Sequence, residues 1–251
     1  MVDDFRTYEE QPAAFCRKAA EEYRRDDEIE IGAVNHRRIC ENLARISSSF
    51  GRKIHVLDVG CGTGRHFHCL RNVELLVGVD ISAEMLRAAE TPVKSEEISA
   101  ENIRLLQRNI YEHTFSSGMF DFIYSFGVFG HGASLTAELG RKFYHWLEEG
   151  GRLYVNTIET SENLLLNAGR RKVKRVVYPL LPQSIQRKLD EREARLPRFT
   201  MTREELDAVM RASGFADFSI SAHVCRSASW SGVHLECIAT KSRRRTCVVQ
   251  A

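Results

Sequence analysis

The sequence predicts an α/β protein built on a doubly wound, mostly parallel sheet. Apolar segments at 54–59, 74–80 and 120–128 alternate with stretches in which apolar residues recur at helical spacing. Three glycines directly follow the first apolar segment, so a buried strand turns sharply there. Because open α/β sheets bind ligands outside the carboxyl ends of their strands, this turn marks the expected site.

The glycine turn at Gly60, Gly62 and Gly64 favours a nucleotide-type cofactor. A helix is expected from Arg65 to about Asn72, and the backbone N–H groups at its start can face a ligand. The glycines are spaced G-x-G-x-G, whereas the dinucleotide fingerprint needs G-x-G-x-x-G. The strand also carries an acid, Asp58, two residues before the first glycine.

The whole stretch, Val56-Leu57-Asp58-Val59-Gly60-Cys61-Gly62-Thr63-Gly64, resembles the first motif of class I methyltransferases that use S-adenosylmethionine (SAM). The resemblance covers about residues 50–240. It implies a Rossmann-like sheet of seven strands with an antiparallel last strand, SAM as cofactor and S-adenosylhomocysteine as product. The cofactor contacts that it implies in this motif are Asp58, Gly60, Cys61, Gly62 and Gly64.

The second strand, 74–80, ends in Asp80, twenty residues after Gly60. A carboxylate at this place can accept hydrogen bonds from both ribose hydroxyls of an adenosine. Alternatively, Asp80 caps the next helix, expected at 83–90, together with Ser82 or Glu84. If the ribose role holds, Ile81 and Met85 pack on the faces of the adenine.

The third strand, 103–107, is followed by Asn109 and Ile110. In the family a polar side chain here, usually an aspartate, meets the adenine amino group, and the next backbone N–H meets a ring nitrogen. Asn109 departs from the usual acid, so it can accept through its side-chain oxygen but without charge assistance.

The fourth strand ends near Ser125, and the loop to His131 is expected to face the methyl donor and the acceptor. Enzymes that methylate exocyclic amines of nucleic-acid bases carry a D/N-P-P-Y/F motif here, which Ser125-Phe126-Gly127-Val128 is not. Methylation of nucleic-acid bases is therefore not expected, and no nucleic-acid partner is predicted. His131 is the candidate that orients or deprotonates the acceptor, because an imidazole titrates near neutrality; the alternative is an exposed loop histidine.

Two helical patterns, at 8–25 and 33–46, precede the first strand. They either lie over the cofactor edge as a lid or merely cover the sheet. A forty-residue segment, 160–199, interrupts the alternation after the fifth strand and is expected to form a helical cap on the acceptor side. Side chains from these parts and from the loop after the fourth strand are the predicted acceptor contacts, namely Tyr8, Tyr23, Phe129, His131 and Tyr178.

Positive charge gathers in the cap. The chain has a net charge of +2, and Arg170, Arg171, Lys172, Lys174 and Arg175 form what we call the basic cluster. It can hold an anionic group on the acceptor or touch an anionic membrane surface, or it is simply solvated. A helix capped by Thr202 and Glu205 and an antiparallel pair at 215–224 and 233–240 complete the fold. We therefore predict a single domain over 1–240, with 1–50 as the lid, and a disordered basic tail at 241–251.

Composition indicates an ordinary globular protein, with 43% hydrophobic and 28% charged residues. The seven cysteines are scattered, odd in number and lack zinc-site spacing. They favour reduced thiols in a cytoplasmic protein over a disulfide framework or a metal site, so no metal is predicted. No apolar run is long enough to span a membrane.

These observations predict a SAM-dependent methyltransferase that acts on an N or O atom of a small molecule. Two alternatives stay open. One is a lipid or quinone methyltransferase at a membrane surface, suggested by the basic cluster and the apolar 176–182. The other is a non-catalytic SAM-binding regulatory subunit, against which the intact Asp58, glycine turn and Asp80 argue. The identity of the acceptor and the oligomeric state are not encoded in any motif.

Overall fold

The computed structural model describes residues 13–130, 132–160, 178–186, 199–226 and 231–243. It contains a seven-stranded sheet in the order β3-β2-β1-β4-β5-β7-β6. The pairs from β3 through to β5 are parallel, whereas β7 runs antiparallel to both of its neighbours. The predicted α/β class with an antiparallel last strand is therefore confirmed.

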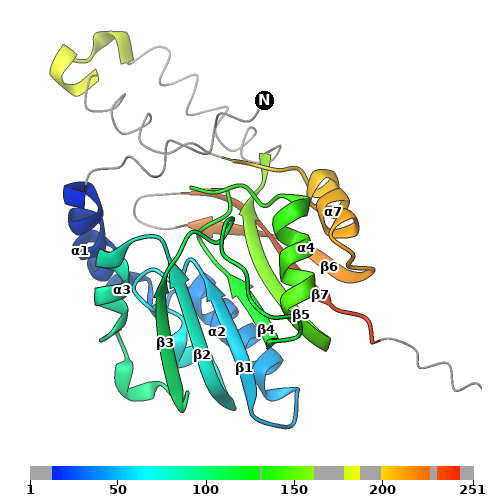
Figure 1. Cartoon of the computed structure of the whole chain (residues 1–251). Helices are drawn as coiled ribbons and strands as arrows, with labels where there is room; N and C mark the ends of the chain where they lie inside the picture. Colours follow the sequence, from blue (N-terminus) through cyan, green and yellow to red (C-terminus); the bar gives the residue numbers. More distant parts are fainter. Residues whose placement is uncertain (1–12, 131, 161–177, 187–198, 227–230, 244–251) are drawn as a thin grey trace, which may run out of the picture.

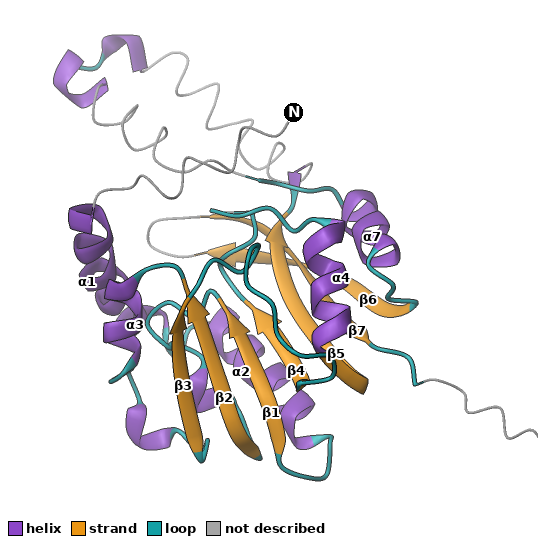
Figure 2. Cartoon of the chain, viewed as in Figure 1, coloured by secondary structure: helices purple, strands orange, loops and turns teal. Residues whose placement is uncertain are grey.

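The strands are β1 (Ile54–Val59), β2 (Val73–Asp80), β3 (Asn102–Gln107), β4 (Phe120–Ser125), β5 (Leu147–Ile158), β6 (Asp217–Arg226) and β7 (Ser231–Thr240). The α-helices are α1 (Ala13–Glu30), α2 (Val34–Ser48), α3 (Ala83–Ala89), α4 (Ala137–Trp146) and α7 (Arg203–Ala212). Short 3₁₀ turns are η2 (Phe67–Cys69), η3 (Ser95–Glu97) and η4 (Tyr178–Leu180). Sheet and helices thus alternate as the sequence indicates (Figure 2).

Helices flank both faces of the sheet (Figure 1). One apolar cluster joins β1, β4 and β5 to α4 and α7 and contains Phe143 and Trp146, both fully buried. The other lies on the opposite face, where Leu43 and Ile46 of α2 pack on β1 and β4 and on the segment after the glycine turn. Side chains that alternate along each strand therefore reach apolar partners on either side.

The sequence left open whether the two N-terminal helices lie over the cofactor edge or cover the sheet, and the structure places one helix in each position. The apolar stripe of α2 covers the sheet. By contrast, α1 packs against α3 and bonds to the segment after the glycine turn (Figure 1). Only α1 thus lies at the edge where the cofactor is expected, while α2 serves the core.

The helix predicted from Arg65 to Asn72 is wrong. Only one tight turn, η2, forms there, with Phe67 N–H bonded to Gly64 and Cys69 N–H bonded to His66. All three residues of η2 are buried, so the segment packs on every side instead of exposing one polar face. In contrast, the capping box of α7 is present, with Thr202 and Glu205 bonded reciprocally.

The expectation of unpaired thiols is wrong for Cys40 and Cys69, which form a disulfide between α2 and η2. Cys61, Cys225 and Cys237 are free and buried. The two bonded cysteines are 29 residues apart, so no local spacing reveals them.

No helix among the described residues is long and apolar enough to cross a membrane. The basic cluster and the tail from 244 onward lie outside the described residues.

Candidate cofactor site

The three glycines of the turn have different surroundings: two are closely packed, and one borders open space. Gly60, Gly62 and Gly64 all have positive φ, at 69°, 53° and 78°. A side chain at Gly60 would lie 2.1 Å from Val128, and one at Gly64 would lie 2.8 Å from the Phe67 ring. At Gly62, however, an added Cβ would meet no atom within 4 Å. The first and third glycines therefore allow close packing, whereas the second borders space that a ligand can enter.

Asp80 joins the second strand to this turn. Its Oδ2 accepts from the Gly62 N–H at 2.9 Å, and its Oδ1 accepts from the Ser82 N–H at 2.9 Å. Burial raises the pKa of Asp80, and these two N–H groups oppose the rise. Each carboxylate oxygen keeps a lone pair for another donor. Asp80 therefore both braces the turn and remains able to accept two ribose hydroxyls, and Ser82 itself caps α3 by accepting from Met85.

Asp58 is the most strongly perturbed acid at the site. It is 3% exposed at the end of β1. Burial raises its pKa to about 8, the Tyr124 hydroxyl partly offsets this, and the charge of Asp80 raises it further. An isolated buried carboxylate is costly, so a cationic ligand placed beside Asp58 would be strongly favoured.

The predicted adenine-side residues have different environments. Ile81 is 38% exposed and Met85 is half-buried, so both can still contact a ligand. The Asn109 oxygen accepts from the Tyr111 N–H at 3.1 Å, and its amide donates to Glu112. Asn109 thus shapes the turn after β3, and its proposed adenine contact stays a prediction. The Ile110 side chain belongs to the core, which leaves its backbone for a ligand.

Three further predicted side chains point into the protein. The Ser125 hydroxyl is fully buried and donates to the Val59 carbonyl at 2.8 Å, tying β4 to β1. Cys61 packs toward Gly78, so only its backbone lines the turn. Phe129 is fully buried against Phe143 in the core, which corrects its proposed role as an acceptor contact. An aromatic ring in a loop of small residues suggested exposure, but the loop folds inward there.

Tyr23 is the predicted acceptor residue that the structure brings to the site. It lies on α1 with nearly half of its surface exposed. Desolvation raises the pKa of its hydroxyl, and the nearby Arg65 opposes the rise while Asp80 adds to it. Tyr8 and His131 lie outside the described residues. The backbone of Tyr178 starts η4.

Sequence reasoning missed the contacts that dock α1. Asp27, 1% exposed, accepts from the Thr63 hydroxyl and pairs with Arg65, both in the segment that begins at the glycine turn. Arg24, one helical turn earlier, donates to the carbonyls of Ala88 and Thr91. Asp27 stands in the charged run Arg24-Arg25-Asp26-Asp27-Glu28, where nothing distinguishes it from solvated neighbours. We call Asp27, Thr63 and Arg65 the α1 latch.

A second unpredicted network lies beyond β4. Glu236 on β7 accepts from the Tyr154 hydroxyl at 2.6 Å and pairs with Arg38 of α2. Two strand positions further along β5, Asn156 accepts from the Gly127 N–H at 3.0 Å. The latter bond fixes the start of the loop that leads toward His131. Asn156 thus fixes the first residues of this loop, while Glu236 ties β5 and β7 to α2.

Comparisons with known proteins agree with this geometry. Residues 56–151 match the family model described as a methyltransferase domain. A tRNA U34 carboxymethyltransferase of Psychromonas ingrahamii is 34% identical over 139 residues, 54% of this chain and 42% of that protein. This chain therefore matches less than half the length of that curated relative.

Two solved structures illustrate the likeness in fold. A putative SAM-dependent methyltransferase from Methanococcus maripaludis has a TM-score of 0.55 at 19% identity, covering 92% of this chain and 95% of that one. A Haemonchus contortus phosphoethanolamine N-methyltransferase, solved with phosphomonomethylethanolamine and S-adenosylhomocysteine, has a TM-score of 0.55 at 15% identity, covering 81% and 53%.

The strand order, the glycine turn with Asp80, and the family match together define a class I methyltransferase fold. Residues 56–151 thus match a methyltransferase domain, and the fold around them is that of SAM-dependent methyltransferases, which indicates SAM as the cofactor. The residues present fit this cofactor, because the space at Gly62 is open, Asp80 has acceptor capacity left, and Asp58 offers a buried acid for a cation.

Proposed function

We propose that this chain transfers a methyl group from SAM to a nitrogen or oxygen atom of a small molecule. The observation that carries the proposal is the α1 latch, which holds a helix over the cofactor edge. A closed edge suits a small acceptor that can be surrounded, whereas a nucleic acid needs an open approach. The basic cluster supports an anionic group on this acceptor.

In this mechanism the protein mainly positions and desolvates its ligands. When bound, SAM supplies a methyl group that its own sulfonium charge activates. Asp80 would hold the ribose hydroxyls, and Asp58 would hold a positive part of the cofactor in a site with little water. The α1 latch excludes solvent, and His131 takes a proton from the acceptor or orients it. Neither the positioning of the ligands nor the proton transfer needs a covalent intermediate with the protein.

A tRNA substrate is the second candidate, because the curated relative is a tRNA U34 carboxymethyltransferase. The basic cluster would then contact phosphates, and activity would fall steeply with salt. The methyltransferase-domain match, residues 56–151, contains Gly62 and Asp80, and a fold with this cofactor site can serve different acceptors. We therefore favour the small molecule.

The deciding experiment measures S-adenosylhomocysteine release with panels of amines, phenols, thiols and carboxylates, and in parallel with unmodified tRNA. We expect turnover with a small acceptor, with a Michaelis constant that depends on the basic cluster. Turnover confined to tRNA would overturn the small-molecule proposal. Turnover that requires anionic liposomes would instead support the membrane-surface alternative, and SAM binding without turnover on any panel would support the regulatory one.

A further inference from the structure

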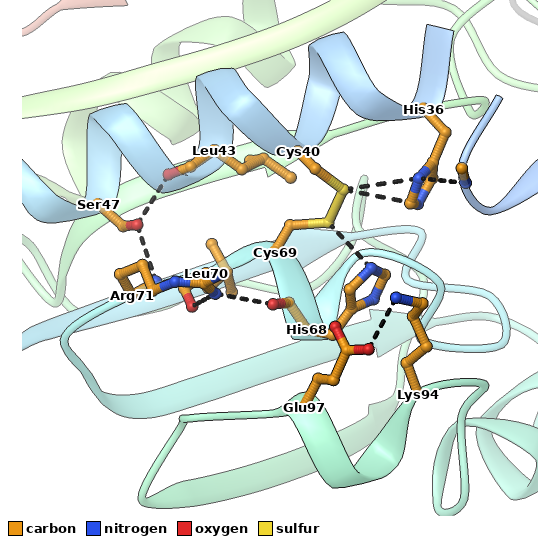
Figure 3. Close-up of a disulfide and its surroundings, with 11 residues drawn as sticks. His36, Cys40, Leu43, Ser47, His68, Cys69, Leu70, Arg71, Lys94 and Glu97 are labelled. Carbon is orange, nitrogen blue, oxygen red and sulfur yellow. Dashed lines mark hydrogen bonds and ion pairs between the residues drawn. A yellow bond between two sulfur atoms is a disulfide. The ribbon is translucent and has the colours of Figure 1, made fainter. Parts of the chain in front are cut away.

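Two cysteines and two histidines form a compact cluster on the α2 side of the sheet (Figure 3). His36 and Cys40 are four residues apart and therefore lie on one face of α2. His68 and Cys69 come from η2, which faces that helix. One ligand atom from each residue can be chosen so that all four lie within 4.8 Å of one another. None of the four belongs to the cofactor site described above.

The spacing within this cluster matches a tetrahedral metal site. Cys40 Sγ lies 3.5 Å from His36 Nε2, and Cys69 Sγ lies 3.6 Å from His68 Nε2. A tetrahedral zinc ion with Zn–S near 2.3 Å and Zn–N near 2.0 Å separates its ligand atoms by about 3.3–3.8 Å. The two sulfur–nitrogen pairs thus already stand at ligand-to-ligand separation. Only the two sulfurs, joined here as a disulfide, must move apart.

The disulfide alone does not account for the histidines. His68 is 7% exposed, and within the part of the chain that the structure describes its Nδ1 has no hydrogen-bond partner. The His36 ring stacks on that of His68 with centroids 5.4 Å apart, so both imidazoles are pressed against the two sulfurs. A metal ion bound at the two Nε2 atoms, which face the sulfurs, would give both rings a common partner, and the His68 Nδ1 would then carry the ring hydrogen.

We propose that, when Cys40 and Cys69 are reduced, this cluster binds one zinc-type divalent cation through His36, Cys40, His68 and Cys69. Two thiolates neutralise the charge of the cation, which suits a cluster in which three of the four residues are buried. Four protein ligands leave no open position, so the site is structural and not catalytic. It clamps α2 to the segment that follows the glycine turn.

The disulfide is the metal-free, oxidised state of the same sulfurs. A phosphine reductant and one water molecule break the S–S bond, giving two thiols and the phosphine oxide. The thiols then lose their two protons to the buffer as the metal binds. Coordination through His36 Nε2 places a hydrogen on His36 Nδ1. This nitrogen then no longer accepts the long 3.3 Å hydrogen bond from the Gly32 N–H. Gly32 is exposed, so water replaces that contact.

The test is a cobalt(II) titration of the full chain, without a histidine tag, in a phosphine reductant. We expect one equivalent to bind with the intense visible bands of a tetrahedral site and a thiolate-to-cobalt charge-transfer band, and zinc(II) to displace it. Absence of these bands in the reduced wild-type protein would overturn the proposal, whatever the variants do.

Substitutions of the histidines and of the cysteines distinguish metal binding from disulfide formation. Replacing His36 and His68 by alanine leaves the disulfide able to form but should abolish the stoichiometric cobalt spectrum, and replacing Cys40 and Cys69 by serine should abolish both. The matched controls are His55→Ala with His113→Ala and Cys225→Ser with Cys237→Ser, which lie outside the cluster. Circular dichroism establishes that each variant is folded. An unchanged spectrum in the folded histidine variant, or loss of the spectrum in either folded control, would contradict the assignment.

Discussion

We predict that Asp58 makes SAM binding depend on pH, by an amount that follows from the pKa of its carboxyl group. Burial raises the pKa of this carboxyl group to about 8, so at neutral pH it carries a proton in the free protein. A cationic cofactor favours the ionised form, so binding must release that proton. The affinity for SAM should therefore rise with pH until the pKa of Asp58 is passed.

The magnitude follows from one protonation equilibrium. At pH 7, about one unit below the pKa of Asp58, ionising the carboxyl group costs about 1.4 kcal/mol, or a factor of about ten in the dissociation constant. At pH 6 the factor is about one hundred. Asp58→Asn cannot ionise, so it should bind SAM more weakly above pH 8 and lose this dependence.

The assay is isothermal titration with SAM between pH 6 and 8.5 for the wild type and Asp58→Asn. The cofactor's own amino group titrates equally for both proteins, so it cancels in the ratio of the two dissociation constants. Asp80→Asn serves as the matched control: it should bind SAM more weakly and keep a pH dependence, moved to lower pH because the charge of Asp80 no longer raises the pKa of Asp58. A ratio that does not change with pH would refute the assignment of Asp58 to a cationic part of the cofactor.

The same acid affects the stability of the folded chain. Because folding raises the pKa of Asp58, the native state keeps a proton that the unfolded chain has lost between about pH 4 and pH 8. Stability from this group is therefore complete below pH 4 and declines as the pH rises toward 8. Asp58→Asn should melt at a higher temperature than the wild type near pH 8, which calorimetry can measure. An equal or lower melting temperature would indicate that the Asn amide finds no partner in the site.

Four further substitutions test the site. Asp80→Ala should weaken SAM binding at least about tenfold in titration, since hydrogen bonds to a charged group contribute about 1.5–3 kcal/mol each. Wild-type affinity in this variant would rule out the ribose role of Asp80. Gly62→Val should weaken binding more, because the valine side chain fills the open space. Asp27→Asn should speed hydrogen exchange throughout α1 while β1 stays protected, because the buried partner of Arg65 loses its charge; unchanged exchange would mean that the α1 latch does not hold the helix. His131→Ala should lower turnover more than acceptor binding, and intact turnover with every accepted substrate would eliminate the catalytic role.

The parts of the site that the sequence predicted depend on local patterns. Positive φ at alternate glycines and a strand-terminal acid twenty residues later are set by short stretches of chain, so the sequence alone places Gly62 and Asp80 at one site. The parallel sheet follows from the same alternation. The sequence leaves two roles open for Asp80, ribose acceptor or cap, and the geometry lets one carboxylate brace the turn and still bind a ligand.

The parts that could not be predicted depend on contacts between distant segments. Asp27 is one of several charges in α1, and only the packing of α1 against the turn singles it out as buried. Phe129 lies in a glycine-rich loop, and its burial follows from the course of that loop over α4. Likewise, Cys40 and Cys69 have no zinc-type spacing in the sequence, because their two elements meet only in the fold.

The segment from Thr63 to Cys69 connects these unpredicted contacts. Its first part holds α1 through Asp27, and its last part holds α2 through Cys40. A short 3₁₀ turn is weakly stabilised by its own hydrogen bonds, so its position depends on its core packing together with these two attachments. Since the same segment begins at the glycine turn, loosening either attachment shifts the backbone that borders the cofactor. We therefore predict that the link between α2 and η2 acts on cofactor binding without touching the cofactor: a change in the state of Cys40 and Cys69 should alter the affinity for SAM while leaving the pH dependence expected from Asp58 unchanged.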